Sequence, residues 1–125
     1  MSGIVSSLMQ RRVRTIGMDD TVAEIEALFV RERLSWAPVT NAGQVVGVIS
    51  ATDLLRFHAT RQDVKPIKAW QLCSYKPITV APDTTLEDLA RLMIAQGIHH
   101  VVVKDAEEIV GVMSSLDFVR TFISD

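Results

Sequence analysis

The stretch "GVISATD" at residues 47–53 returns as "GVMSSLD" at residues 111–117, 64 positions further along the chain. Both copies read glycine, two apolar residues, serine, two variable residues and aspartate. A serine in such a stretch could be a catalytic nucleophile, a phosphate contact or the cap of a helix. The residues around the two copies help to separate these interpretations.

The repetition extends well beyond these seven residues. Residues 15–58 align with residues 79–122 without a gap, and twelve aligned positions are identical. One register kept over such a length indicates an internal duplication, which is the first feature to look for in a sequence. We place repeat 1 at residues 1–62 and repeat 2 at residues 63–125.

Each repeat carries the same order of local patterns. A short extended segment precedes a threonine-x-x-acid sequence typical of helix starts, at Thr21 and at Thr85. Apolar residues then recur on one helical face, and two β-rich runs follow that could form a hairpin or lie as neighbours in a sheet. A closing helix is expected over residues 52–61 and 115–124, and a short helix within the connecting "PIKAWQLC" at 66–73.

These patterns predict an α+β fold of two β-α-β-β-α repeats. A single repeat of about 60 residues would bury little apolar surface, so the two are expected to pack through their sheets around a pseudo-twofold axis. Gly97 is a natural end for the helix of repeat 2, whereas repeat 1 has Arg33 at the matching position.

Composition and charge exclude several classes of protein. The net charge of -2 makes nucleic acid an unlikely partner, and the absence of any apolar run near 20 residues predicts no membrane span. Cys73 is the single cysteine and is expected to be structural, because it cannot form an internal disulfide. This cysteine usage favours a reducing compartment, so we expect a cytoplasmic protein.

The two segments "DDTVAEIEALFVRERLSWAPVTNAGQVVGVISATDLLR" and "PDTTLEDLARLMIAQGIHHVVVKDAEEIVGVMSSLDFVR" together resemble a tandem pair of cystathionine-β-synthase (CBS) domains, called a Bateman module. The resemblance covers nearly the whole chain. The chain is similar to those members of the family that consist of a CBS pair alone. The resemblance implies a non-enzymatic regulatory module that binds AMP, ADP, ATP, S-adenosylmethionine or sometimes NAD in clefts between the repeats. It also implies association into a flat homodimeric disc and an unidentified regulated protein, with no required cofactor or metal.

The resemblance also implies the ligand contacts. Each cleft is expected to combine the entry segment of one repeat with the Ser-x-x-Asp of the other. One cleft would take Thr79, Ile98, His99 and His100 with Ser50 and Asp53, and the other would take Thr15, Leu34, Ser35 and Ala37 with Ser114 and Asp117.

The residues of each Ser-x-x-Asp allow two interpretations. Ser-x-x-Asp is close to a capping box, in which case the residues only begin a helix. The same helix start offers N–H groups to a phosphate, and the carboxylate of Asp53 or Asp117 can accept hydrogen bonds from both hydroxyls of a ribose. Both interpretations can hold together.

The two clefts are not expected to be equal. His99 and His100 of repeat 2 correspond to Ser35 and Trp36 of repeat 1, which lack a cationic group. Ligand binding through imidazole is expected to be weaker than through arginine or lysine and to depend on pH. Trp36 could stack on adenine or simply pack. Six basic residues are further phosphate candidates, although such residues are usually solvated: Arg11, Arg12, Arg14, Arg56, Lys76 and Arg120.

Two functional hypotheses remain open at this point. The first is a sensor of an adenosine-containing ligand, and the second is a structural interaction module whose clefts are empty or degenerate. A hydrolase acting through Ser50 or Ser114 is disfavoured, because the sequence shows no partnered base and no oxyanion arrangement.

Overall fold

The computed structural model describes residues 1–60 and 66–123, which form two compact units. The first-repeat unit is Arg14–Pro77, and the second-repeat unit joins Met1–Val13 to Ile78–Asp125. Residues 1–13 therefore belong with the second repeat, although they precede the first one in the chain. The predicted repeat boundary at 62/63 and the predicted helix ends at Arg61 and Ser124 lie outside the described residues.

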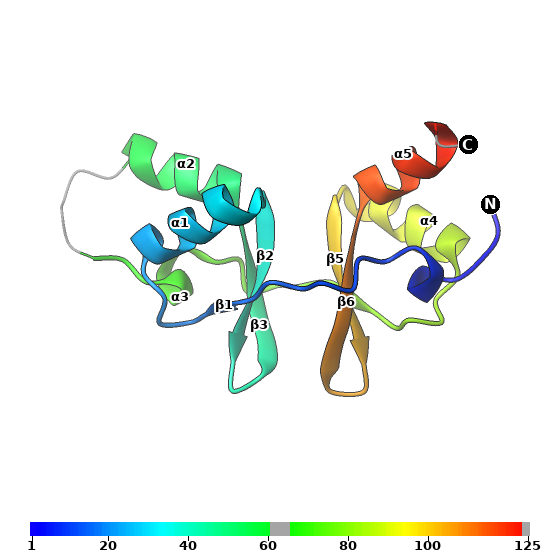
Figure 1. Ribbon diagram of the computed structural model, residues 1–125, viewed down its shortest axis with the longest axis horizontal. Helices are drawn as coiled ribbons and strands as arrows, with labels where there is room; N and C mark the ends of the chain where they lie inside the picture. The colour runs from blue at the N-terminus through cyan, green and yellow to red at the C-terminus, as the bar shows by residue number, and fades with distance from the viewer. Residues whose placement is uncertain (61–65, 124–125) are drawn as a thin grey trace. The chain divides into compact units, whose positions relative to one another are not determined.

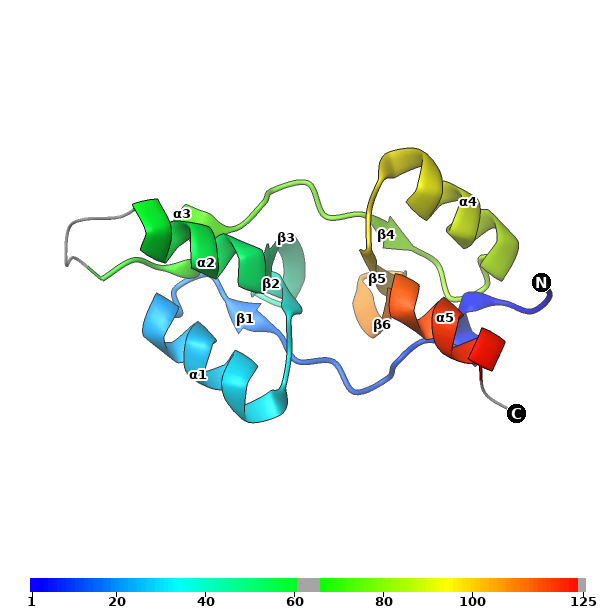
Figure 2. The same cartoon turned by 90° about the horizontal axis from the view of Figure 1, so that it is seen from above.

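The first-repeat unit is built on a three-stranded sheet in which β2 is central. β1 runs parallel to β2, and β2 pairs antiparallel with β3. Two helices lie side by side on one face of this sheet, and a short third helix follows them in the chain (Figures 1 and 2). The elements are β1 (Ile16–Gly17), α1 (Val22–Glu32), β2 (Trp36–Asn41), β3 (Gln44–Ser50), α2 (Ala51–Thr60) and α3 (Ala69–Leu72).

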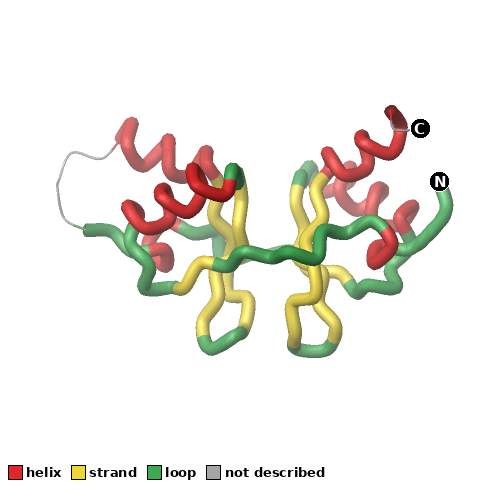
Figure 3. Tube along the Cα trace, viewed as in Figure 1, coloured by secondary structure: helices red, strands yellow, loops and turns green. Residues whose placement is uncertain are grey.

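The second-repeat unit has the same plan, with β5 at the centre of its sheet. A 3-10 turn at Val5–Ser7 occupies the place that α3 has in the first-repeat unit. Figure 3 shows the same succession of helix and strand in both units. The elements are β4 (Thr79–Val80), α4 (Leu86–Gln96), β5 (His100–Asp105), β6 (Glu108–Ser114) and α5 (Ser115–Ile123). The predicted α+β class and the duplicated unit are confirmed.

The β-rich runs are hairpins, which settles the alternative that the sequence left open. In the first hairpin Asn41 pairs with Gln44, so the loop is only Ala42 and Gly43. Both loop residues have positive φ, 52° and 80°, as a type I′ turn requires. Such turns match the twist of the strands that they connect.

The apolar faces predicted for the helices are buried. Ile25 and Phe29 of α1 pack in the core of the first-repeat unit, and Leu89 and Met93 of α4 do the same in the second. The capping box at Thr21 is complete, since Thr21 and Glu24 exchange side-chain and backbone hydrogen bonds. At Thr85 the hydroxyl accepts from the N–H of Asp88.

The glycine that opens each repeated heptapeptide has a packing reason. The segment at Ser74 bonds to β3 through two hydrogen bonds with Val48, each 2.9 Å. A Cβ at Gly47 would collide with the carbonyl oxygen of Ser74. A Cβ at Gly111 of β6 would meet the side chain of Met9 and the carbonyl oxygen of Gln10, in the segment that bonds to Val112. The glycines therefore let a segment from outside the hairpin cross its second strand.

Candidate functional site

Ser50 and Asp53 form a closed hydrogen-bonded ring at the junction of β3 and α2. Asp53 Oδ2 accepts from the Ser50 N–H at 2.8 Å and from Ser50 Oγ at 2.9 Å. The Asp53 N–H donates in turn to Ser50 Oγ at 3.2 Å. The capping interpretation is confirmed for this pair. The other carboxylate oxygen, Oδ1, lies 3.4 Å from Arg56 Nη1, and the Asp53 side chain is 26% exposed.

Ser114 and Asp117 repeat this arrangement at the junction of β6 and α5, with one addition. Asp117 Oδ2 accepts from the N–H and the hydroxyl of Ser114 at 2.8 and 3.1 Å. Its Oδ1 accepts from Arg120 Nη1 at 3.1 Å and also from Gln10 Nε2 at 2.9 Å. The Asp117 side chain is only 6% exposed. Asp117 is therefore more buried than Asp53 and accepts one more side-chain hydrogen bond, from Gln10.

The helix starts offer a phosphate fewer donors than the sequence suggested. The first N–H of α2, on Ala51, donates to the Ser35 carbonyl at 2.8 Å. The N–H of Ser115, which begins α5, donates to the His99 carbonyl at 2.9 Å. Because these groups are already bonded, the aspartate carboxylates are the more promising contacts for a ligand.

The structure brings other predicted residues of each repeat beside its Ser-x-x-Asp. Trp36 is the partner of Ser50 across the β2–β3 ladder, and His100 is the partner of Ser114 across the β5–β6 ladder. Trp36 and His100 are both half-buried, whereas His99 is exposed. The difference between the repeats that the sequence indicated thus lies directly against the two serines.

His100 has an altered acid–base behaviour. Burial lowers the pKa of His100 below its usual value, and repulsion from His99 lowers the pKa further. The nearby Asp117 carboxylate opposes this shift. At neutral pH, His100 is therefore an uncharged hydrogen-bonding group beside Ser114 rather than a cation for a phosphate.

The remaining predicted residues occupy three kinds of position. Thr15 and Thr79 are exposed where β1 and β4 begin. Ala37 lies in the core, so only its backbone could meet a ligand. Leu34 lines a cavity of about 250 Å³ beside α1 and α2, and Ile98 packs against the core of its unit. The combination of contacts from different repeats stays a prediction.

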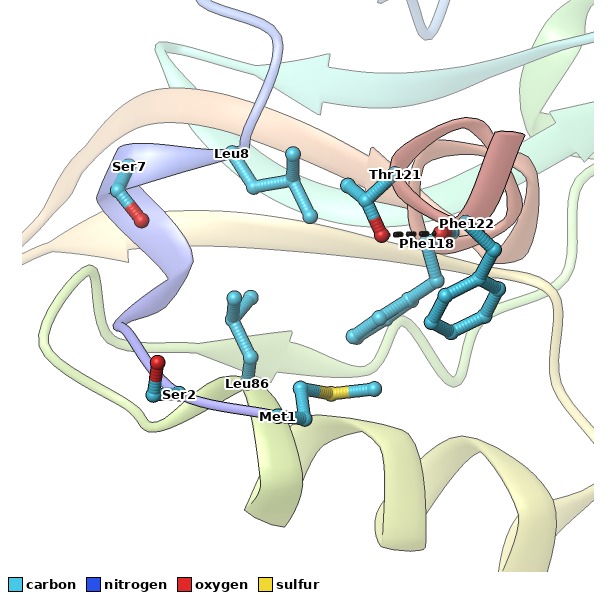
Figure 4. A pocket seen from close by; sticks show the side chains of 8 residues that line it. All are labelled: Met1, Ser2, Ser7, Leu8, Leu86, Phe118, Thr121 and Phe122. Atoms are coloured by element: carbon cyan, nitrogen blue, oxygen red, sulfur yellow. Dashed lines mark hydrogen bonds between the residues drawn. The ribbon is translucent and has the colours of Figure 1, made fainter. Parts of the chain in front are cut away.

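A larger cavity of about 310 Å³ lies in the second-repeat unit, away from the predicted contacts. Phe118 and Phe122 of α5 face Leu86 of α4 across it, and Thr121 bonds to the Phe118 carbonyl at 2.7 Å (Figure 4). Its lining residues are Met1, Ser2, Ser7, Leu8, Leu86, Phe118, Thr121 and Phe122. None of them belongs to the predicted ligand contacts.

Several of the basic residues have internal partners. Arg14 forms an ion pair with Glu32 at 2.6 Å, and Arg11 donates to the Ser6 carbonyl at 2.9 Å. Cys73 is buried, consistent with a structural role. Within residues 1–60 and 66–123 no cluster of ligating side chains could hold a metal ion, and no helix is long and apolar enough to cross a membrane.

Gln10 is a functional candidate that the sequence did not reveal. Its side chain bonds to Asp117 although the two residues are 107 positions apart. The available signal was the resemblance of residues 4–10 to residues 68–74, which puts Gln10 in register with Ser74. The sequence alone did not show that either residue lies against a strand next to a Ser-x-x-Asp.

The chain belongs to the CBS domain family, whose model matches residues 5–59 and 69–124. An uncharacterized protein of Methanocaldococcus jannaschii, MJ0188, is 27% identical over 98% of this chain. The chain spans only 45% of that relative. The CBS domain-containing protein YhcV of Bacillus subtilis is 25% identical over 97% of this chain and 86% of its own length.

A solved structure also shares the fold. The CBS domain pair of protein MJ0100, in complex with 5′-methylthioadenosine and S-adenosyl-L-methionine, has a TM-score of 0.87 and 21% identity. The match covers 98% of this chain and 97% of that one. The tandem CBS pair indicated by the sequence is therefore confirmed.

Proposed function

We propose that the chain is a regulatory module that binds an adenosine-containing ligand and changes the activity of a partner protein. The observation that carries the proposal is the Asp53 carboxylate. Ser50 holds it through two hydrogen bonds, yet its side chain is 26% exposed. Among the residues that the structure describes, its Oδ1 meets only a long contact from the exposed Arg56. A fixed carboxylate with an available oxygen suits the two adjacent hydroxyls of a ribose.

The ligands of structures with the same fold support this choice of compound. The CBS pair of MJ0100 was solved with 5′-methylthioadenosine and S-adenosyl-L-methionine. These two compounds share an adenosine group and differ in the 5′ substituent. The ribose and the base are therefore the groups that we expect the present chain to recognise, with AMP, ADP, ATP or S-adenosylmethionine as candidate ligands. Thr15, Leu34, Ser35, Ala37, Thr79, Ile98, His99 and His100 remain the proposed surrounding contacts.

The test is the stabilisation of the chain by adenosine compounds in thermal unfolding. A ligand that binds the native state raises the melting temperature by mass action, and about 100 Kd of free ligand adds about 2.7 kcal/mol. We expect stabilisation by at least one of AMP, ADP, ATP, S-adenosylmethionine, 5′-methylthioadenosine and NAD. The 2′-deoxy and 3′-deoxy forms of the active compound should stabilise less, because each lacks one hydroxyl of the diol.

A pair of matched variants connects the effect to the site. Asp53→Asn should remove most of the stabilisation that depends on the ribose. Asp88→Asn is the control, since Asp88 has the same place in the first turn of α4 but is not a predicted contact. If none of the compounds stabilises the chain or binds more tightly than millimolar, the sensor function is wrong and the structural interaction module becomes the better hypothesis.

Association into a homodimer is a second part of the proposal. Each unit presents large apolar side chains to solvent on its helices, including Val30 of α1 at 80% exposure and Ile94 of α4 at 82%. These two residues are counterparts in the repeat. The family resemblance implies that a second copy of the chain binds to such surfaces.

A further inference from the structure

The carboxylate of Asp117 is already saturated by the protein, whereas that of Asp53 is not. An ionised carboxylate has about four lone-pair sites. At Asp117 all four have donors: the N–H and hydroxyl of Ser114 on Oδ2, and Arg120 and Gln10 on Oδ1. Within residues 1–60 and 66–123, the Oδ1 atom of Asp53 has only the 3.4 Å contact from Arg56. A diol could therefore reach Asp53 without displacing a protein group.

The difference arises from one pair of residues in register. Gln10 and Ser74 occupy the same place, because the backbone of each forms two 2.9 Å hydrogen bonds with the matching strand residue, Val112 or Val48. The longer side chain of Gln10 reaches Asp117 at 2.9 Å. Ser74 is exposed, and within the described part of the chain its hydroxyl makes no hydrogen bond to Asp53.

We propose that Gln10 acts as a built-in competitor for the Asp117 carboxylate, so that an adenosine ligand fills the Asp53 site first. The inference rests on the proposed ribose recognition and names the residue that makes the two sites unequal. The Gln10 side-chain amide occupies a lone pair that a ribose hydroxyl needs. A ligand at Asp117 must break this charge-assisted hydrogen bond, and such bonds are stronger than neutral ones.

The same displacement gives the module a graded response. At low ligand concentration the Asp53 site fills and the Gln10 contact stays intact. At higher concentration a ligand that enters at Asp117 releases the Gln10 side chain from α5. The segment that carries Gln10 is held to β6 by its backbone, so the released side chain rather than the segment is the element that moves first.

Calorimetric titration with AMP can measure the two sites separately. In the Asp53→Asn background only the Asp117 site remains, and in the Asp117→Asn background only the Asp53 site remains. We expect AMP to bind at least about tenfold more tightly to the second variant than to the first, because a hydrogen bond to a charged group must be broken at Asp117. Where AMP does not stabilise the chain, the adenosine compound that does so most strongly replaces it as the probe.

The decisive experiment exchanges the residue types at the two corresponding positions, Gln10 and Ser74. Gln10→Ser in the Asp53→Asn background should tighten AMP binding about tenfold, and Ser74→Gln in the Asp117→Asn background should weaken it by a similar factor. Gln10→Met keeps the length of the side chain without its amide, so it should act like Gln10→Ser if the serine variant folds poorly. Gln44→Ser, at the exposed first residue of β3, is the control and should change neither affinity.

The outcomes separate this inference from the function on which it rests. If adenosine compounds bind but both sites have equal affinity, or if Gln10→Ser and Gln10→Met leave the Asp117 site unchanged, Gln10 is not a competitor and the sensor function stands. If no adenosine compound binds to the chain or to any variant, both the sensor function and the role of Gln10 are wrong.

Discussion

At the scale of single residues, the partner that each serine faces sets the chemistry of its repeat. Ser50 faces Trp36, which cannot titrate, whereas Ser114 faces His100. Burial and the neighbouring His99 keep His100 neutral, although the Asp117 carboxylate favours the proton. The second repeat therefore has a half-buried titratable group opposite its serine, where the first repeat has Trp36.

We predict that His100 makes the folded state less stable as the pH falls. Because its folded pKa lies below the unfolded value of about 6.5, the unfolded chain binds more protons below that pH, and the free energy of unfolding decreases. The stability is fully present above about pH 6.5 and is lost toward the lower folded pKa. Urea denaturation at pH 8 and pH 5.5 should show a smaller loss for His100→Gln than for the unmodified chain.

His99→Gln is the intermediate case for this prediction. It removes the repulsion that helps to lower the pKa of His100, so its loss of stability should lie between those of the other two proteins. The His58–Glu26 contact is unchanged in all three proteins, so it does not contribute to the difference between them. Identical losses of stability in His100→Gln and the unmodified chain would show that burial does not control the protonation of His100.

At the scale of elements, the first helix of each repeat is followed by a C-cap residue in the left-handed conformation, but the residue type differs. The C-cap of α4 is Gly97, which has φ 63° and ψ 33°, and the C-cap of α1 is Arg33, with φ 56° and ψ 45°. The left-handed conformation is open to glycine but costs roughly 1–2 kcal/mol for a residue with a Cβ. The chain keeps the geometry at Arg33 because the Leu34 N–H then bonds to the Phe29 carbonyl at 2.8 Å.

We predict that Arg33→Gly stabilises the chain and that Gly97→Arg destabilises it. Relief of the left-handed strain is partly offset by the greater freedom of glycine in the unfolded state, so the net gain should be about 0.5–1 kcal/mol. Thermal and urea unfolding can measure both changes. Arg31→Gly, inside the last turn of the same helix, separates the local effect from a general one, because glycine there should destabilise α1 by about 1 kcal/mol. A loss of stability in Arg33→Gly would contradict the account.

The sequence was sufficient for the elements and for the Ser-x-x-Asp arrangement, because these depend on local patterns. Thr21 with Glu24 and Ser50 with Asp53 are three residues apart, so their hydrogen bonds follow from helix geometry. The Gln10–Asp117 contact could not be predicted, since it depends on which strand the segment at Met9 crosses. The missing Cβ of Gly111 leaves room for this segment, and that close approach is visible only in the folded structure.

At the scale of the whole molecule, most of the exposed large apolar residues lie on helices. In the first-repeat unit these include Val30 and Leu55, and in the second-repeat unit Ile94, Val119 and Phe122. Single exposed apolar residues are ordinary in soluble proteins. Exposed apolar residues at matching helix positions of both repeats favour a binding surface that each repeat presents. A symmetric dimer uses the same surface on each copy.

We predict that Val30→Lys combined with Ile94→Lys shifts the chain from dimer toward monomer. A buried lysine without a partner must be desolvated, so dimer dissociation should rise by at least about tenfold. Sedimentation velocity over a range of concentrations would measure this, and an unchanged melting temperature of each unit's core would show that folding is intact. Ala95→Lys, beside Ile94 and also exposed, adds the same charge next to the apolar position. These helix faces do not form the dimer if the unmodified chain is a monomer. The same holds if the double variant and the unmodified chain have equal dimer dissociation constants.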